Sequence, residues 1–264
     1  MIKLCVAGAT GRMGSTLVRE AASRGYQIVA AIAAPDEPSI GKTLQELGIC
    51  NLNIKVSPPS EIKEVAKNAD VYVSFTSPNA ELTNLPIVAD MGKRIVMGTT
   101  GFTEAEFNKL KDYVGQRVPA VFSFNFSIGV NFMLKMLKVL KGLPKDYDLS
   151  IMEAHHTGKK DAPSGTALTM AKLLSSMRGY SKLVHGREGI KPRKPEEMEV
   201  LSVRGGGIPG IHWVIIAGAY EMIKIEHVAF SRNIFAQGAL YAAEWIVKQT
   251  KPGIYTMEDV LGGG

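Results

Sequence analysis

Cysteine is scarce in this chain of 264 residues, which contains only Cys5 and Cys50. Two cysteines cannot build the disulfide framework of a small secreted domain, and Cys5 lies in an apolar run where we expect a small buried side chain. Long hydrophobic runs are also missing. No window approaches the roughly 18 uninterrupted apolar residues of a transmembrane helix. We therefore expect a protein of a reducing compartment that does not enter a membrane.

Targeting signals are missing as well. The chain begins directly with a strand-like pattern, without the charged start, apolar core and cleavage site of a signal peptide. We expect a cytoplasmic location. A plastid location would apply to a plant protein, but no transit peptide is visible.

Clusters of basic residues with aromatic neighbours are absent too. The formal net charge is +6, yet the lysines and arginines are scattered along the chain. Nucleic acid is therefore not an expected partner. The charge fits either a mildly basic protein without a charged partner or one that attracts an anionic ligand. With 45% hydrophobic and 21% charged residues, the chain has the composition of a globular protein with one or two domains.

A glycine loop separates the first predicted strand, residues 2–7, from the first predicted helix, residues 15–23. Its residues are Gly8, Ala9, Thr10, Gly11, Arg12, Met13 and Gly14. In a strand–loop–helix unit such glycines allow a tight turn, a close approach of the backbone to pyrophosphate, and close packing of helix on sheet. The helix N-terminus adds free N–H groups and positive potential. We therefore expect dinucleotide binding here.

The second predicted strand, residues 27–33, ends without the acid that usually holds the ribose hydroxyls of NAD. Ala33 and Ala34 occupy that place, and Asp36 comes slightly late. Lys42 or Arg12 is available to a 2′-phosphate. We therefore expect NADPH, or use of both nucleotides, although a loop that contacts neither ribose remains open.

Strands and helices alternate through the N-terminal half, which predicts a parallel doubly wound sheet. Thr103 and Glu106 form a predicted capping box for one helix. Polar or aromatic segments follow the predicted strands of residues 71–75, 94–97 and 118–122. Ligands bind at the carboxyl ends of strands in such sheets. We therefore expect these segments, which include Gly98, Thr99, Thr100, Phe124, Asn125 and Phe126, to lie on the nicotinamide side of the site.

The pattern changes after residue 126. An apolar helix is predicted over residues 128–140 and a strand over 147–154, and the helix of residues 167–177 precedes a basic loop over 178–196. Residues 199–204, 213–219 and 222–228 are predicted antiparallel strands, so we expect a mixed or antiparallel sheet in an α+β domain. The dinucleotide-binding domain is predicted as residues 1–126, to which residues 235–264 return with a last helix. Residues 127–234 form the predicted substrate-binding and oligomerisation domain.

The chemistry of the second half is concentrated in residues 153–166. His155 and His156 stand side by side, Lys159 follows, and Ser164, Gly165 and Thr166 precede a predicted helix. Histidine is the side chain poised to transfer protons near neutral pH, and a lysine stabilises negative charge that develops during a reaction. The serine and threonine are equally explained as helix caps. Neighbouring histidines on a strand point to opposite faces, so we expect no metal site.

Taken together, the glycine loop, the segments of residues 98–101 and 125–131, the segment of residues 153–167 and residues 203–206 resemble 4-hydroxy-tetrahydrodipicolinate reductase, also called dihydrodipicolinate reductase. The resemblance runs from end to end of the chain. It implies reduction of a cyclic unsaturated dicarboxylate with NADH or NADPH in diaminopimelate and lysine biosynthesis, and assembly as a homotetramer through the C-terminal sheets. One departure is the pair Ala33–Ala34, where family members often carry an acid with a basic neighbour.

The resemblance also assigns roles to residues. His155 is implied as the proton donor. Lys159, which the chemistry makes a candidate catalytic cation, is implied to help hold the substrate. His156, Ser164, Gly165 and Thr166 are implied to hold the substrate. The glycine loop and the segments of residues 98–100 and 124–126 match cofactor positions. Two alternatives remain open. One is another two-domain NAD(P)-dependent amino-acid dehydrogenase, and the other is a dinucleotide-sensing protein without catalysis, for which no DNA-binding module is visible.

Overall fold

The computed structural model describes residues 1–262 and divides the chain into two compact units. The first unit contains Met1–Ile128 together with the segment from Arg232 onward, and the second contains Gly129–Ser231. Within residues 1–262, no helix combines the length and the apolar character needed to cross a bilayer.

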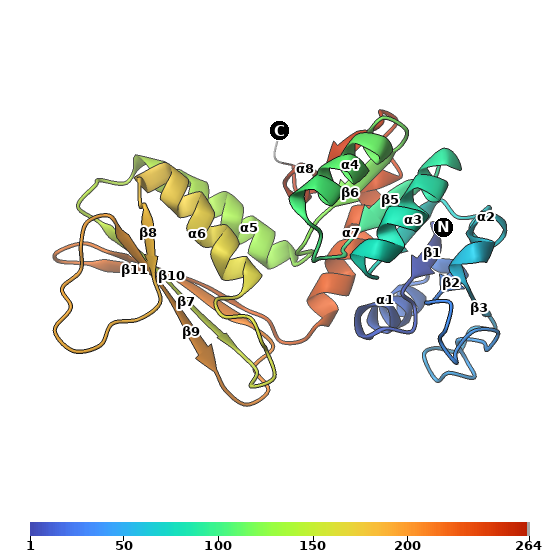
Figure 1. Ribbon diagram of the computed structural model, residues 1–264, viewed down its shortest axis with the longest axis horizontal. Helices are drawn as coiled ribbons and strands as arrows, with labels where there is room; N and C mark the ends of the chain where they lie inside the picture. The colour runs from blue at the N-terminus through green and yellow to red at the C-terminus, as the bar shows by residue number, and fades with distance from the viewer. Residues whose placement is uncertain (263–264) are drawn as a thin grey trace. The chain divides into compact units, whose positions relative to one another are not determined.

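The first unit is built on a seven-stranded parallel sheet with the order β12-β6-β5-β4-β1-β2-β3 (Figure 1). The chain crosses over after β3 to reach β4 on the other side of β1, as in a doubly wound nucleotide-binding sheet. The strands are β1 (Lys3–Ala7), β2 (Gln27–Ile32), β3 (Val56–Ser57), β4 (Val71–Ser74), β5 (Arg94–Met97), β6 (Pro119–Phe122) and β12 (Gly253–Tyr255).

Helices cover both faces of this sheet because its strands alternate apolar side chains to both sides. In β1, Leu4 and Val6 join the core that contains the apolar faces of α1, α7 and α8, whereas Cys5 and Ala7 join the core with α2, α3 and α4. The helices are α1 (Arg12–Ser23), α2 (Ile62–Val65) after a 3-10 turn (Pro59–Glu61), α3 (Pro78–Asp90), α4 (Glu104–Gly115), α7 (Asn233–Ile246) and α8 (Met257–Val260). The expected capping box at Thr103 and Glu106 is present at the start of α4.

The C-terminal helix α7 belongs to this unit although it follows the whole second unit in sequence. It packs beside α1 on the same face of the sheet (Figure 1). Gly238 lies so close to the loop after β6 that a Cβ there would meet the carbonyl oxygen of Phe126 at 1.7 Å. The helix therefore supports the loop that ends β6.

The second unit contains a five-stranded sheet with the order β11-β10-β7-β9-β8. Its elements are α5 (Ile128–Leu137), a 3-10 turn (Lys138–Gly142), β7 (Asp148–His155), α6 (Gly165–Arg178), β8 (Lys182–Val184), β9 (Glu197–Arg204), β10 (Ile211–Ala217) and β11 (Met222–Val228). Residues of α5 and α6 share one core with the buried side chains of this sheet (Figure 1).

The expectation that residues 199–204 form an antiparallel strand is wrong, although the sheet as a whole is mixed as expected. The strand β9 runs parallel to both β7 and β8, whereas β10 is antiparallel to β7 and β11. The chain returns to the edge of β7 through the helix α6, and a helical crossover delivers a parallel strand. The basic loop also contains the short strand β8.

Candidate active site

The glycine loop between β1 and α1 is shaped by close backbone contacts. Gly8 has a φ of +74°, and a Cβ on it would lie 2.3 Å from the carbonyl oxygen of Phe75. A Cβ on Gly14 would lie 1.9 Å from the carbonyl oxygen of Gly8, whereas a Cβ on Gly11 would lie 3.3 Å from the same atom. The first and third glycines are therefore required by the fold, while Gly11 leaves the loop open on its outer side.

Segments far apart in sequence meet at one hollow of about 310 Å³ in the first unit. We call it the glycine-loop hollow. It is lined by Arg12, Met13, Phe75, Gly98, Thr100, Phe124, Asn125, Phe126, Arg232 and Phe235. The structure thus brings the glycine loop together with residues from the ends of all three strands that the sequence singled out, β4, β5 and β6. Arg232 and Phe235 were missed because they arrive on α7 from the far end of the chain.

The glycine Gly98 makes room for an aromatic ring in this hollow. A Cβ on Gly98 would lie 2.2 Å from the ring of Phe75, and that ring makes an edge contact with Phe126 at 5.9 Å between centroids. The three segments that end β4, β5 and β6 are therefore packed directly on one another.

Thr99 does not line the hollow, because its hydroxyl is committed elsewhere. It donates to Glu81 Oε1 at 2.6 Å and accepts the backbone N–H of Thr76 at 2.9 Å. Thr76 donates to the same carboxylate oxygen at 2.6 Å. Glu81 is fully buried in the first turn of α3, and burial raises its pKa although both threonine hydroxyls oppose that rise. No sequence pattern singles out this carboxylate, which ties the loop after β4 to the loop after β5.

An acid does reach the glycine loop, although none stands at the end of β2. The carboxylate of Glu37 accepts a hydrogen bond from the hydroxyl of Thr10 at 2.7 Å and another from Ser39 at 3.1 Å. The loop after β2 therefore folds back onto the glycine loop and carries a carboxylate to it. The sequence pattern missed Glu37 because it lies beyond the position where such an acid is expected.

In the second unit, the strand β7 carries two neighbouring polar side chains on the same face, Glu153 and His155. The ring atom Nδ1 of His155 lies 2.6 Å from Glu153 Oε2. Arg204, at the end of β9, donates to both oxygens of Glu153, each at 2.8 Å. The pairing of His155 with Arg204 in the register of β7 and β9 places the three side chains together.

The start of α6 is fixed to the same cluster. The backbone N–H of Ser164 donates to Glu153 Oε1 at 3.1 Å, and the Ser164 hydroxyl accepts the N–H of Ala167 at 3.2 Å. That hydroxyl also lies 3.0 Å from Nε2 of His212, a residue of β10 that the sequence did not single out. Ser164 is buried, and both its N–H and its hydroxyl are engaged. The helix-cap interpretation of Ser164 therefore holds in this structure.

Lys159 lies in the turn between β7 and α6. Its Nζ lies 2.8 Å from Asp161 Oδ1, and its backbone N–H donates to the carbonyl oxygen of His156. The Lys159 side chain and the backbone N–H of Gly165 together lower the pKa of Asp161. A carboxylate of the protein itself thus lies beside both the lysine and the N-terminus of α6, where we expect a substrate carboxylate.

The remaining expected substrate residues, His156 and Thr166, lie close by in sequence. His156 follows the last residue of β7 and is partly exposed. Thr166 is the second residue of α6. Among the described residues, no group of three or more His, Cys, Asp or Glu side chains is arranged to hold a metal ion.

The charges of the cluster are set by its contacts. Burial would raise the pKa of Glu153, but the hydrogen bonds from Arg204, His155 and Ser164 outweigh it and lower that pKa to about 2. Burial lowers the pKa of His155, and the Glu153 carboxylate partly opposes that shift. Burial lowers the pKa of His212 to about 4. At neutral pH Glu153 is therefore an anion and His212 is neutral.

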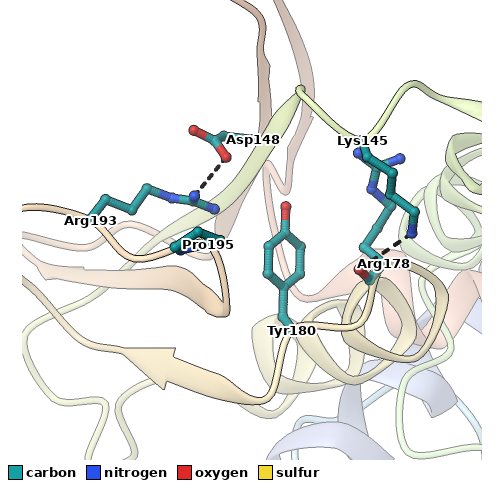
Figure 2. A pocket seen from close by; sticks show the side chains of 6 residues that line it. All are labelled: Lys145, Asp148, Arg178, Tyr180, Arg193 and Pro195. Atoms are coloured by element: carbon teal, nitrogen blue, oxygen red, sulfur yellow. Dashed lines mark hydrogen bonds and ion pairs between the residues drawn. The ribbon is translucent and has the colours of Figure 1, made fainter.

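A hollow in the second unit contains none of the expected site residues. Arg193 pairs with Asp148 at 2.6 Å, and Tyr180 lies between this pair and Arg178 in Figure 2. The guanidinium of Arg178 donates to the carbonyl oxygens of Leu143, Pro144 and Tyr147. These contacts tie the end of α6 to the loop before β7, so this hollow is explained by the fold.

Comparison with known proteins is consistent across the whole chain. Residues 2–126 match the family model described as dihydrodipicolinate reductase, N-terminus, and residues 129–261 match the corresponding C-terminus model. A 4-hydroxy-tetrahydrodipicolinate reductase of Methanosarcina acetivorans is 45% identical over 99% of this chain and 100% of its own length. A relative of the same name from Methanopyrus kandleri is 41% identical over 100% of this chain and 98% of its own length.

A solved structure has the same fold at lower sequence identity. The dipicolinate-bound dihydrodipicolinate reductase from Paenisporosarcina sp. TG-14 is similar with a TM-score of 0.75 and 22% identity, and 97% of each chain is covered.

Proposed function

The chain belongs to the dihydrodipicolinate reductase family, and we propose that it reduces 4-hydroxy-tetrahydrodipicolinate to tetrahydrodipicolinate in the diaminopimelate route to lysine. It is an oxidoreductase that uses NADH or NADPH. The observation that carries the proposed chemistry is the contact between Glu153 and His155, because it leaves one nitrogen of a partly buried histidine as the proton donor. The cytoplasmic location stays a prediction.

The residues of the glycine-loop hollow fit a dinucleotide. The backbone around Gly11 is open, the N-terminus of α1 follows it, and the aromatic side chains of Phe124 and Phe126 line the hollow. Nicotinamide supplies the hydride when the cofactor is bound. Gly98, Thr100 and Asn125 line the same hollow, while Thr99 acts through the loops that it holds together.

In the proposed reaction, a side chain of the second unit protonates the substrate. The 4-hydroxy substrate must lose its hydroxyl as water to form a conjugated C=C–C=N system. Adding hydride to one carbon of that system then requires a proton at a neighbouring atom. Nδ1 of His155 is bound to an anionic carboxylate, so Nε2 is the atom that carries the transferable proton. The ammonium of Lys159 is suited to stabilise the negative charge that develops on the substrate.

The substrate carboxylates find donors at the start of α6. Gly165 and Thr166 are the first residues of that helix and provide N–H groups at its positive end. In this structure Lys159 pairs with Asp161. In the proposed complex it pairs with a substrate carboxylate instead. His156 completes the proposed set of substrate contacts, while Ser164 shapes the helix start through its cap.

The contact between Glu37 and Thr10 supports a preference for NADH, which is opposite to the expectation from sequence. A carboxylate beside the glycine loop accepts hydrogen bonds from ribose hydroxyls and repels a 2′-phosphate. Use of both nucleotides stays part of the proposal, because Arg12 lines the same hollow and carries a positive charge.

The exposed face of the second sheet supports the proposed homotetramer. Along β10, His212, Val214 and Ile216 are buried, whereas the alternate residues Trp213 and Ile215 are only partly covered. The helices of this unit pack on the opposite face, so a second copy of the chain is the proposed cover. Light scattering at micromolar concentration tests this, and a monomer would contradict it.

The proposed activity is tested by following NADH and NADPH oxidation with freshly prepared product of dihydrodipicolinate synthase. Saturable turnover with at least one nucleotide is expected. No turnover with either nucleotide, in a folded protein that binds them, would contradict the proposed substrate. Turnover instead with an amino acid or its semialdehyde would favour another two-domain dehydrogenase.

A further inference from the structure

We propose that Glu153 is a positioning residue that fixes the tautomer of His155, and that Arg204 holds this carboxylate in place. Its kinetic consequence rests on the proposed function, whereas the tautomer itself is a property of the protein without any ligand. The argument uses contacts within the second unit alone.

The first step is the state of the carboxylate. Glu153 is fully buried and accepts two parallel hydrogen bonds from Arg204, one from the N–H of Ser164, and one from the ring of His155. Two parallel bonds from a guanidinium are the strongest arrangement available to a carboxylate. With every oxygen supplied with donors, Glu153 remains an anion and does not itself exchange protons during the reaction.

The second step is the tautomer of the histidine. An ionised carboxylate only accepts hydrogen bonds, so the contact at 2.6 Å requires a hydrogen on Nδ1 of His155. This holds for the neutral ring and for the imidazolium. The proton that is gained and lost is therefore always the one on Nε2. Without Glu153, the hydrogen of a neutral histidine would occupy either nitrogen. Only the form with its hydrogen on Nδ1 takes up its next proton on Nε2, the atom that donates in the proposed reaction.

The third step is the space around the donating atom. A Cβ on Gly210 would lie 3.1 Å from Nε2 of His155, so the absence of a side chain there leaves room beside this nitrogen. The ring of His212 meets the ring of His155 edge-on at 5.2 Å between centroids and is neutral at physiological pH. Glu153 is bound to Nδ1, so Nε2, which borders the position of Gly210 where no side chain blocks it, is the nitrogen left to donate.

The charged groups around His155 come from several elements. Glu153 lies on β7, Arg204 on β9 and His212 on β10, while Lys159 lies in the turn after β7. The two cations oppose protonation of His155 and the carboxylate favours it. Glu153 is the one member of this set that touches His155 through a ring hydrogen bond, which is why its removal changes the tautomer as well as the charge.

The direct test is the pair of ring nitrogen chemical shifts of His155, measured by ¹⁵N NMR in the folded enzyme without ligand at a pH where the ring is neutral. His155→Gln identifies the signals. The expected result for the unsubstituted protein is a protonated Nδ1 and an unprotonated Nε2. A neutral ring with its hydrogen on Nε2 would overturn the proposal, whatever the enzyme's activity.

The second test compares Glu153→Gln with a matched control, Glu197→Gln. Glu197 is also a buried carboxylate held by an arginine, Arg187, at 2.9 Å, but it lies roughly 23 Å from Arg204 along β9 at ~3.3 Å per residue. Glu153→Gln should shift His155 toward a mixture of tautomers and lower kcat by about 10²-fold or more, with the KM for NADH changed less than about threefold. Glu197→Gln should leave the tautomer and kcat near those of the unsubstituted enzyme.

The outcomes separate the proposal from its premise. If Glu153→Gln keeps the Nδ1 hydrogen and a near-normal kcat, the positioning role is wrong. If the unsubstituted enzyme has the expected tautomer but no turnover, the proposed function fails and the positioning contact stands. If Glu153→Gln does not fold, Glu153→Asp takes its place. This variant retains the charge, so it should keep the tautomer and recover part of kcat, and an Nε2 tautomer in it would count against the proposal.

Discussion

The hydroxyl of Ser164 lies 3.0 Å from Nε2 of His212 and also accepts the backbone N–H of Ala167. One side chain therefore caps α6 and joins that cap to the strand β10. The contact also links the helix start to the histidine whose ring packs on His155.

Ser164→Ala removes both contacts and leaves a polar atom of His212 buried without its partner. We expect the free energy of unfolding to fall by about 1–3 kcal/mol. Urea denaturation, followed by a spectroscopic signal from the second unit, measures it. Ser77→Ala is the matched control, because Ser77 caps α3 in an exposed position through the N–H of Ala80. That variant should lose about 1 kcal/mol. Equal losses would mean that the contact with His212 contributes nothing.

Gly11→Ala should mainly weaken nucleotide binding, whereas Gly14→Ala should mainly lower the stability of the fold. A methyl group on Gly14 would overlap the carbonyl of Gly8, so this variant should lower the thermal midpoint or prevent folding. A methyl group on Gly11 would lie 3.3 Å from the carbonyl oxygen of Gly8, which is a much milder contact, but it occupies the side where a pyrophosphate would approach. Gly11→Ala should therefore lower the thermal midpoint less than Gly14→Ala does, and it should bind NADH at least about tenfold more weakly in a fluorescence titration. Unchanged affinity would remove Gly11 from the nucleotide site.

Glu37 should determine the nucleotide preference. The unsubstituted enzyme is expected to bind NADH more tightly than NADPH by about tenfold, equivalent to about 1.4 kcal/mol. Glu37→Gln should move the ratio toward NADPH because it removes the repulsion of a 2′-phosphate while keeping an acceptor near Thr10. Asp36→Asn is the control, since Asp36 is exposed and neighbours Glu37 in sequence. A stronger affinity for NADPH in the unsubstituted enzyme would refute this assignment, and direct titration decides it without the substrate.

Glu81→Gln should change how stability depends on pH. The raised pKa of Glu81 in the folded protein means that folding favours its protonated form, so its contribution is fully present below the unfolded pKa of about 4.5 and is lost as pH rises through the folded value. The variant should therefore gain stability relative to the unsubstituted protein between pH 5 and pH 8. Thermal midpoints across that window measure it, with the exposed Glu64→Gln as control. A constant difference would mean that Glu81 stays ionised.

Much of the fold could be predicted from the sequence, because local patterns determine it. The apolar strands, the glycine loop and the helix caps are read from neighbouring residues, and the meeting of Gly98 with Phe126 follows from parallel strands ending at one edge. The parallel pairing of β7 with β9 could not be read locally, since it depends on the crossover through α6.

The supporting carboxylates of the site escaped prediction for the same reason. Glu153 is paired with Arg204, Glu81 with Thr99 and Glu37 with Thr10, and each pair is brought together by tertiary structure rather than by sequence spacing. A buried acid in a strand or helix pattern resembles an ordinary surface acid until its neighbours are known. Ser164 and Thr99 show the converse, because their hydroxyls are already engaged in holding the protein together.

The central claim is that His155 donates the proton while nicotinamide donates the hydride, and His155→Gln tests it most directly. The measurement is kcat for NADH oxidation with the dihydrodipicolinate synthase product, alongside the NADH affinity of the same variant. The account predicts a kcat lowered by about 10²-fold or more with unchanged NADH affinity. A kcat within about threefold of the unsubstituted enzyme would contradict it and assign the proton to another donor.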